Sequence, residues 1–216
     1  MALVPTNLMR ITLIHALRPS IDPIQEAFAR LWPEAELRNV LDDSLSRDLA
    51  LAGRLDESMI QRFLALGRYA VSAGTDGILF SCSAFGPAID AVARDLAPLP
   101  VRKPNQAMIE QAVRLGGRIA IVSSFQPTLD SIPTEFPAGT ELLPVFVKGA
   151  MAALSAGDGA AHDRLVVEAC KRVPCDVIAL TQFSIARSAR VVEEATGKPV
   201  LTTPDAAVED LKSLYR

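Results

Sequence analysis

The sequence predicts an α/β fold of two pseudo-symmetric lobes, each a parallel sheet flanked by helices, with the functional site in the cleft between them. Short β-branched runs alternate with longer segments of helical periodicity along the 216 residues, a pattern typical of parallel sheets covered by helices. The segment RITLIHALRP of the first half is echoed by RIAIVSSFQP, roughly 100 residues later, as expected for duplicated lobes. No Pro/Gly/Ser-rich linker separates the halves, so we expect the lobes to pack tightly.

The first half is predicted to hold three strands and three helices. Asp22 precedes Pro23 and an apolar helical face, so we expect it to cap the first helix. The segment 56–73 has a strong amphipathic pattern. In chain order we predict a strand over 10–17, a helix capped by Asp22, a strand over 36–41, a helix over 56–73, a strand over 77–81 and a helix beginning at Pro87.

The second half repeats this alternation. We predict helices over 105–115, 128–136, 158–173 and 185–196, a last helix opened by Asp205, and strands over 118–123, 142–147, 177–180 and 200–202. The boundary is placed within 98–104, which gives an N-terminal lobe of 1–100 and a C-terminal lobe of 101–204. The final helix, 205–216, is a candidate to cross back onto the first lobe.

Composition restricts the partners and the compartment. The net charge is −3 with no basic stripe, so we expect neither nucleic acid nor an anionic membrane as a partner. No apolar run reaches the ~20 residues of a membrane span, and the N-terminus lacks a signal-peptide pattern, so we expect a cytoplasmic protein. The chain has three cysteines, and the cytoplasm keeps thiols reduced, so we expect no disulfides. It has two histidines and neither a CxxC nor an HExxH motif, so we expect no metal site. A homo-oligomer remains possible.

Four polar turns are predicted at the carboxyl ends of strands, where parallel α/β sheets bind ligands. They span 15–20, 81–86, 123–128 and 181–184, and are rich in Ser, Thr and small residues. Helices begin just after them, and helix N-termini favour anions. The expected ligand is therefore a small carboxylate.

Cys82 lies in the second of these turns, between an apolar strand and a helix. A helix N-terminus lowers the pKa of a thiol, so Cys82 is a candidate base or nucleophile. The alternative, a buried packing cysteine, is about equally favoured by position alone. Cys170 and Cys175 are interpreted as structural.

The two histidines and the remaining turns have competing interpretations. His15, at the end of the first strand, is either a hydrogen-bonded structural residue or a group that contacts substrate or tunes the thiol. His162 is expected to be solvated. The turn 42–44 is either a helix cap or a substrate contact. Likewise, 123–126 is either a local turn or a carboxylate site.

The segment FSCSAFG, which contains Cys82, resembles the first cysteine motif of the aspartate/glutamate racemase superfamily, a group that includes aspartate, glutamate and hydantoin racemases, maleate isomerase and arylmalonate decarboxylase. The resemblance extends over nearly the whole chain in element order, with IHALRPS and VSSFQPT similar to the substrate-binding turns. It implies cofactor-independent chemistry with Cys82 as the catalytic residue. It further implies substrate binding by His15, Ser83, Ala84, Ser123, Ser124, Phe125, Thr181 and Gln182.

The chain departs from this pattern in the second lobe. LTQFSIA matches the second cysteine motif, but Gln182 stands in the cysteine position, and an amide is neither an acid nor a base near pH 7. We therefore expect an isomerase or racemase-like enzyme acting at the α-carbon of a small carboxylate or amino-acid-like substrate with one family cysteine. The alternatives are a decarboxylase or other lyase, a carboxylate-binding protein without turnover, and a different α/β enzyme; reactivity of the thiol separates an enzyme from a binding protein.

Overall fold

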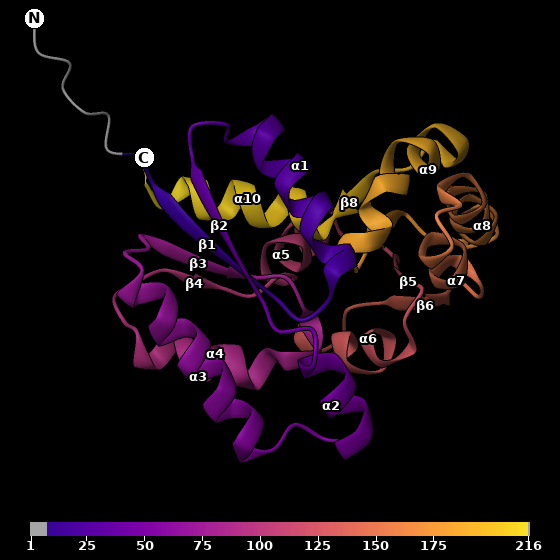
Figure 1. Ribbon diagram of the computed structural model, residues 1–216. Coiled ribbons are helices and arrows are strands. Elements are labelled where there is room, and N and C mark those ends of the chain that lie inside the picture. The colour runs from indigo at the N-terminus through magenta and orange to yellow at the C-terminus, as the bar shows by residue number, and fades with distance from the viewer. Residues whose placement is uncertain (1–7, 216) are drawn as a thin grey trace, which may run out of the picture.

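The computed structural model describes residues 8–215 and contains two four-stranded parallel sheets (Figure 1). The strand orders, β2-β1-β3-β4 and β6-β5-β7-β8, are equivalent, so the predicted pseudo-symmetric α/β fold is confirmed. The strands are β1 (Arg10–His15), β2 (Glu36–Leu41), β3 (Gly77–Phe80), β4 (Val101–Arg102), β5 (Ile119–Ser123), β6 (Leu142–Phe146), β7 (Val177–Leu180) and β8 (Val200–Thr202).

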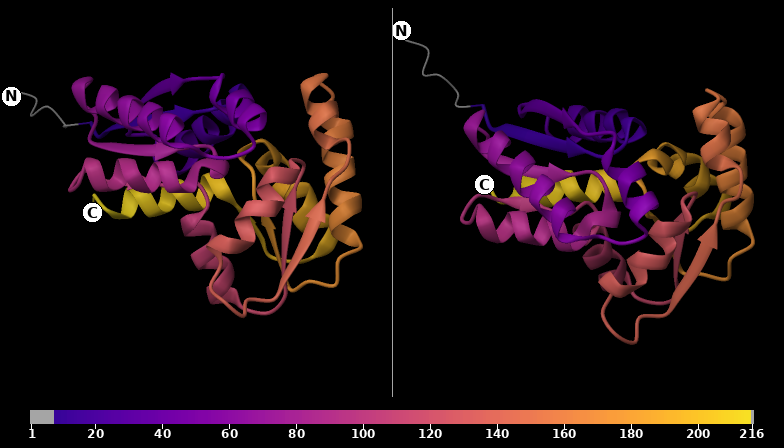
Figure 2. Two further views of the ribbon diagram at one scale, coloured as in Figure 1. Left: turned by 90° about the horizontal axis from the view of Figure 1, so that it is seen from below. Right: turned by 60° about the horizontal axis from the view of Figure 1, so that its bottom comes forward.

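Helices cover the sheets and connect their parallel strands. Two views show the lobes side by side, with the last helix running along the first lobe (Figure 2). The α-helices are α1 (Ile21–Leu31), α2 (Leu45–Ala52), α3 (Glu57–Ser72), α4 (Gly86–Asp95), α5 (Gln106–Leu115), α6 (Gln126–Ser131), α7 (Ala150–Ser155), α8 (Gly159–Lys171), α9 (Ala189–Thr196) and α10 (Thr203–Ser213). Short 3₁₀ turns are η1 (Arg18–Ser20), η2 (Ser83–Phe85), η3 (Ile132–Glu135) and η4 (Phe183–Ser188).

The central strands of each sheet form the core. β3, β5 and β7 are buried along their whole length, and β1 is buried after its first residue, as expected for strands covered on both faces. In the first lobe, Phe63 on α3 packs against Phe80 and Phe85, with ring centroids 5.4 and 4.8 Å apart. This packing holds the two ends of the turn that carries Cys82.

The last helix, α10, links the lobes. Val208 and Leu211 are buried in one cluster with Ile11 and Phe28 of the first lobe. At its ends, Asp205 pairs with Arg30 and Asp210 pairs with Arg102, each at 2.7 Å. The final helix therefore crosses back to pack beside α1 (Figures 1 and 2).

Several predicted boundaries were wrong. Ser20, not Asp22, occupies the N-cap of α1. Thr202 caps α10 by accepting a hydrogen bond from the Asp205 amide at 3.3 Å, so Asp205 lies in the first turn. The strand β4, which was not predicted, extends the first sheet to Arg102.

Two predicted helices are each divided. The segment 128–136 is α6 followed by η3, and 185–196 is η4 followed by α9. Pro133 lies in the first turn of η3, where a missing backbone N–H interrupts the helical ladder. The short helix α7 was not predicted. A helix capped by the turn 42–44 was one of two interpretations of that turn, and Ser44 is indeed the N-cap of α2, whose bounds were not predicted.

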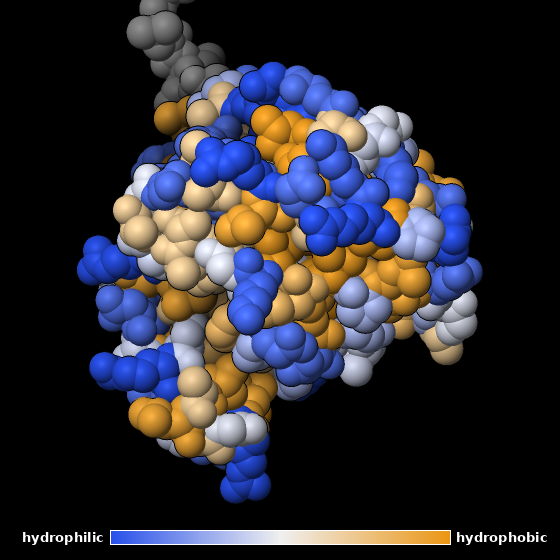
Figure 3. All heavy atoms as spheres, turned by 90° about the vertical axis from the view of Figure 1, so that its right-hand side faces the viewer, coloured by the Kyte–Doolittle hydropathy of each residue, from blue (hydrophilic) through white to orange (hydrophobic). Residues whose placement is uncertain are grey.

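The outer surface is mixed in character. On the face that includes the α7–α9 side of the molecule, hydrophobic patches lie between hydrophilic side chains (Figure 3). Phe146 on β6 and Leu165 on α8 are among the exposed large hydrophobic residues. Within residues 8–215, no helix combines the length and hydropathy needed to cross a membrane.

Candidate active site

A cavity of about 370 Å³ lies between the lobes at the carboxyl ends of the strands, and we call it the inter-lobe cavity. Both sheets contribute to it through the turns that follow their central strands, as is general for ligand sites in parallel α/β folds. The first lobe contributes Leu17, Pro19, Ser20, Ser46, Arg47, Ala50, Ser81, Cys82, Ser83 and Ala84; the second contributes Pro104, Asn105, Phe125, Thr128, Met151, Ser155, Thr181, Gln182, Phe183 and Ser184.

Cys82 reaches this cavity from the turn between β3 and η2. Burial raises the pKa of its thiol to about 11, although the Ala84 backbone N–H and the Ser46 hydroxyl act in the opposite direction by favouring the thiolate. The lowered pKa expected from the sequence is therefore wrong. One reason is local: the α4 helix begins only at Gly86, after the short η2 turn, so Cys82 does not cap an α-helix. At neutral pH Cys82 is a protonated thiol.

Gln182 approaches the same cavity from the turn after β7. Its Oε1 accepts a hydrogen bond from the Ser124 backbone N–H at 2.7 Å, and the hydroxyls of Ser123 and Ser124 lie 2.8 and 3.1 Å from the same oxygen. A backbone N–H is only a donor, so the atom that it contacts must be the amide oxygen. The Gln182 amide orientation is therefore fixed by β5 and the turn that follows it.

His15 lies behind the cavity rather than in it. The side chain is fully buried, with Nδ1 2.8 Å from the Ser81 hydroxyl and Nε2 2.9 Å from Asn39 Oδ1. The tautomer in which Nε2 donates to Asn39 Oδ1 and Nδ1 accepts from Ser81 satisfies both ring nitrogens. Burial lowers the pKa of His15, against the opposite effect of Asn39. Its only link to the cavity is through Ser81.

The structure brings most of the predicted site residues together. Lining the cavity are Cys82, Ser83, Ala84, Phe125, Thr181 and Gln182. Ser123 and Ser124 do not line it but hold Gln182 from behind, and His15 does not reach it. The prediction that His162 is solvated was wrong: its side chain is fully buried between α8 and η4, with Nδ1 3.0 Å from Asp163.

Sequence reasoning missed the contribution of two short helices. α2 places Ser46, Arg47 and Ala50 at the cavity, and α7 places Met151 and Ser155 there. α2 follows the edge strand β2, and α7 follows the equivalent edge strand β6. The internal repeat could have identified α2 and α7 as a pair. In a duplicated fold, an element that reaches the site from one lobe implies an equivalent element from the other lobe.

The charges around the cavity are few. Arg47 is the only Lys or Arg among the described lining residues, and no Asp or Glu is among them. The Arg47 side chain is 73% exposed and lies 3.8 Å from Asp48. The acidic groups nearby in sequence are engaged elsewhere, since Asp42 and Asp48 pair with Arg62 at 2.6 and 2.7 Å. The remaining lining is neutral.

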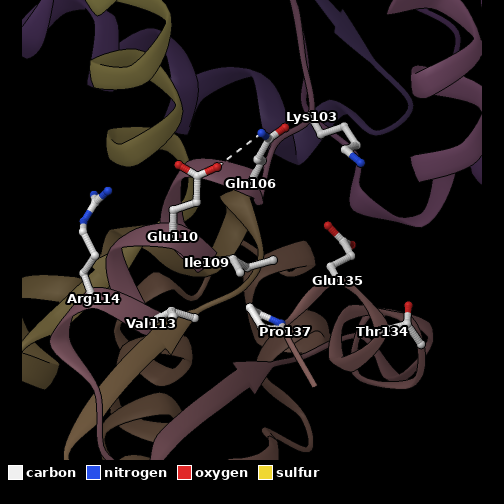
Figure 4. Close-up of a pocket in the computed structure, with 9 residues that line it drawn as sticks. All are labelled: Lys103, Gln106, Ile109, Glu110, Val113, Arg114, Thr134, Glu135 and Pro137. Carbon is white, nitrogen blue, oxygen red and sulfur yellow. Dashed lines mark hydrogen bonds between the residues drawn. The ribbon is translucent and has the colours of Figure 1, made fainter. Parts of the chain in front are cut away.

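A second hollow, of about 600 Å³, lies along α5 on the second lobe (Figure 4). Lys103 and Glu135 face one another across it, and Gln106 donates to Glu110 at 3.3 Å. Lys103 also pairs with Asp90 at 3.1 Å. Its described lining contains no thiol and no imidazole, so the inter-lobe cavity is the better candidate for an active site.

Solved structures share this two-lobed architecture. An allantoin racemase from Klebsiella pneumoniae is similar with a TM-score of 0.73 and 22% identity, covering 96% of this chain and 87% of that one. The maleate isomerase Iso from Pseudomonas putida S16 has a TM-score of 0.65 and 15% identity, covering 96% and 93%. A mutant of arylmalonate decarboxylase, in a sulfate-associated form, has a TM-score of 0.66 and 19% identity, covering 95% and 92%.

No match was found among curated protein sequences. Residues 26–211 match the family described as Asp/Glu/hydantoin racemase. The match includes the turns that carry Cys82 and Gln182 and most of both sheets. This protein therefore belongs to the Asp/Glu/hydantoin racemase family.

Proposed function

We propose that this protein is a cofactor-independent enzyme that uses Cys82 as its acid/base at the α-carbon of a small carboxylate. Its family and its structural relatives include racemases, an isomerase and a decarboxylase, all of which are enzymes. One observation carries the proposal. Among the described residues that line the cavity, Cys82 is the only one whose side chain exchanges a proton at accessible pH. The alternative of a carboxylate-binding protein without turnover predicts that this thiol transfers no proton.

One acid/base on one face limits the stereochemistry. Cys82 can remove and return an α-proton from its own side of the substrate, but Gln182 cannot supply a proton from the other side. We therefore expect α-proton exchange with retained configuration and little racemisation of aspartate, glutamate or hydantoins.

Decarboxylation is the second candidate, and the protonated state of Cys82 favours it. A thiol with a pKa of about 11 is a proton donor at rest. Loss of CO₂ from a malonate leaves its bonding electron pair on the α-carbon and needs no base. The Cys82 thiol would then protonate that carbanion, and solvent would return a proton to the thiolate.

Deuterium incorporation tests both candidates. In D₂O, wild-type protein is expected to exchange the α-proton of a chiral 2-substituted carboxylate with retention, or to convert a 2-substituted malonate into one enantiomer carrying one deuterium. Cys82→Ala should lower either rate by roughly 10²–10⁴-fold, whereas Cys175→Ala, which removes a buried thiol that does not line the cavity, should not. Absence of both reactions in wild type would support the binding-protein alternative, and enzyme-like racemisation would contradict the one-acid/base mechanism.

A further inference from the structure

We propose that Gln182 binds the carboxylate of the substrate through its Nε2 hydrogens, and that the substrate carries no α-ammonium group. The proposal rests on the proposed function, because it names the substrate class of the same cavity. It also assigns a binding role to Gln182, the residue that stands in the position of the second family cysteine.

The first step is the fixed orientation of the Gln182 amide. With Oε1 held at 2.7 Å by the Ser124 backbone N–H, rotation of the amide by half a turn would set one N–H against another. The hydroxyls of Ser123 and Ser124 add donors on the same side. The NH₂ group of Gln182 is therefore held on the side away from β5.

The second step concerns what that NH₂ group contacts. Nε2 donates no hydrogen bond to any atom of residues 8–215, and it is not among the fully enclosed unsatisfied atoms. Because Gln182 lines the inter-lobe cavity, these two N–H donors are open to a ligand there. Such donors favour an anionic acceptor, since charge-assisted hydrogen bonds are stronger than neutral ones.

The third step concerns geometry across the cavity. Gln182 follows β7 of the second sheet and Cys82 follows β3 of the first, and these strands hold equivalent positions. A carboxylate held by Gln182 on one wall leaves the adjoining carbon directed toward the opposite lobe, where the thiol lies. A neutral amide serves this role without competing for the proton.

The fourth step excludes an amino acid. A buried ammonium group requires a partner of opposite charge, and the described lining of the cavity holds no Asp or Glu. Asp42 and Asp48 are already paired with Arg62. Leu17, Phe125 and Phe183 instead offer apolar surface. The cavity therefore suits a carboxylate with an apolar, uncharged α-substituent.

Isothermal titration calorimetry with phenylacetate and phenylglycine tests both parts. The two probes share the ring and the carboxylate and differ in the α-ammonium group. Wild-type protein is expected to bind phenylacetate at least tenfold more tightly than phenylglycine. Equal or tighter binding of phenylglycine, or no detectable binding of phenylacetate, would overturn the assigned substrate class.

Two variants test Gln182 itself. Gln182→Met should weaken phenylacetate binding by roughly 10- to 100-fold, the effect expected for a lost hydrogen bond to a charged group. Gln182→Glu keeps the acceptor for Ser124 but opposes the ligand with a second negative charge. Its binding should be weaker still at pH 8 and should recover, relative to wild type, as the pH falls and the new carboxyl is protonated. A residue 182 remote from the bound carboxylate would not produce this pH dependence.

Gln106→Met is the matched control, because Gln106 lies in the α5 hollow and its side chain bonds, within residues 8–215, to Glu110. It should bind phenylacetate as wild type does. If Gln182→Met fails to fold, the Gln182→Glu pH series decides the question, because that variant preserves the acceptor of the Ser124 N–H. Unchanged affinity in the folded Gln182 variants would overturn the assignment. Failure of the proposed function would differ: wild type would bind phenylacetate through Gln182 yet show no Cys82-dependent proton transfer.

Discussion

Cys82 and Gln182 follow equivalent strands of the two sheets, and both side chains line the same cavity. In a two-thiol mechanism these positions would remove and return a proton on opposite faces of the α-carbon, as the sequence resemblance implies. Here one position holds a thiol and the other a neutral amide. The pair therefore occupies the two positions that the two-thiol mechanism uses, with only one of the two proton-transfer groups.

Gln182→Cys should supply the missing group and create weak racemisation. The new thiol would enter the cavity from the other lobe, where it is expected to return on one face a proton that Cys82 removes on the other. Chiral chromatography of an α-deuterated carboxylate, incubated with each variant, would follow the loss of configuration. Gln182→Ser is the control, because a hydroxyl is too weak an acid to replace the thiol. Retention in the cysteine variant, with exchange still active, would show that the two side chains do not face the same carbon.

The alkylation of Cys82 should be slow at neutral pH and should rise about tenfold per pH unit. The thiolate is the reactive form, and burial places the pKa of Cys82 at about 11. In denaturant the same cysteine should instead level off above roughly pH 8.5, the ordinary thiol pKa. Cys170, fully buried with a pKa of about 12, should react more slowly than Cys82 throughout. Mass spectrometry of iodoacetamide-labelled peptides would measure all three cysteines, and a Cys82 plateau near pH 8.5 in the folded protein would contradict this picture.

Ser46→Ala should raise the pKa of Cys82 further. The Ser46 hydroxyl, on α2, favours the thiolate. Its single hydrogen is donated to the Ala16 carbonyl at 3.2 Å in this structure, so it stabilises the thiolate by turning toward the sulfur. Its loss removes one of the two groups that oppose the effect of burial. The expected result is a slower Cys82 alkylation at every pH below 11, by several-fold if the lost bond is worth about 1 kcal/mol. Ser131→Ala, which removes a half-buried hydroxyl whose bonds are to carbonyls of its own helix, should leave the rate unchanged.

Much of the fold could be predicted because it depends on local pattern. Buried runs such as GILF and VIAL mark β3 and β7 by their apolar, β-branched character. The internal repeat then implies two equivalent sheets. Local pattern could not give the bounds of elements that are too short to show a hydrophobic period. These include α2, α7 and the two-residue strand β4.

The site was predicted less completely than the fold. Cys82 and Gln182 stand in motif turns, so their positions follow from the strand order. The pKa of Cys82 does not, because it depends on burial by side chains from other elements. His15 illustrates the same limit: its place at a strand end suggested the cavity, but its partners, Asn39 on β2 and Ser81 just after β3, hold the ring behind the cavity.

Phe63→Ala should lower the free energy of unfolding by about 3–5 kcal/mol, as is typical of a buried aromatic side chain. Phe63 is 2% exposed and contacts Phe80 and Phe85, so its removal leaves a cavity beside the Cys82 turn. Urea denaturation would measure the change. Tyr69→Ala on the same helix is the control, because that side chain is 60% exposed and should change stability by no more than about 0.5 kcal/mol. A loss below about 1 kcal/mol in Phe63→Ala would mean that the aromatic cluster repacks.

His15→Gln should destabilise the protein more at pH 7.5 than at pH 5.5. At the higher pH the neutral imidazole makes a buried hydrogen bond to Ser81 and a partly buried one to Asn39, and their disruption is expected to cost about 1–3 kcal/mol. Burial lowers the pKa of His15 in the folded state. As the pH falls below about 6.5, the ordinary histidine pKa, the unfolded chain therefore takes up a proton that the folded chain does not.

This uptake of a proton by the unfolded chain alone lowers the free energy of unfolding of wild type on acidification, by at most about 1.4 kcal/mol per pH unit. The variant has no histidine at position 15 and does not lose this stability. The gap in unfolding free energy between the two proteins should therefore narrow on acidification. Groups that both proteins share, including the paired carboxylates, cancel in this comparison. Urea denaturation of both proteins across the interval would measure the gap. A gap that stays constant or widens toward pH 5.5 would mean that His15 is protonated in the folded protein, which would return it to consideration as a charged partner of the Cys82 site.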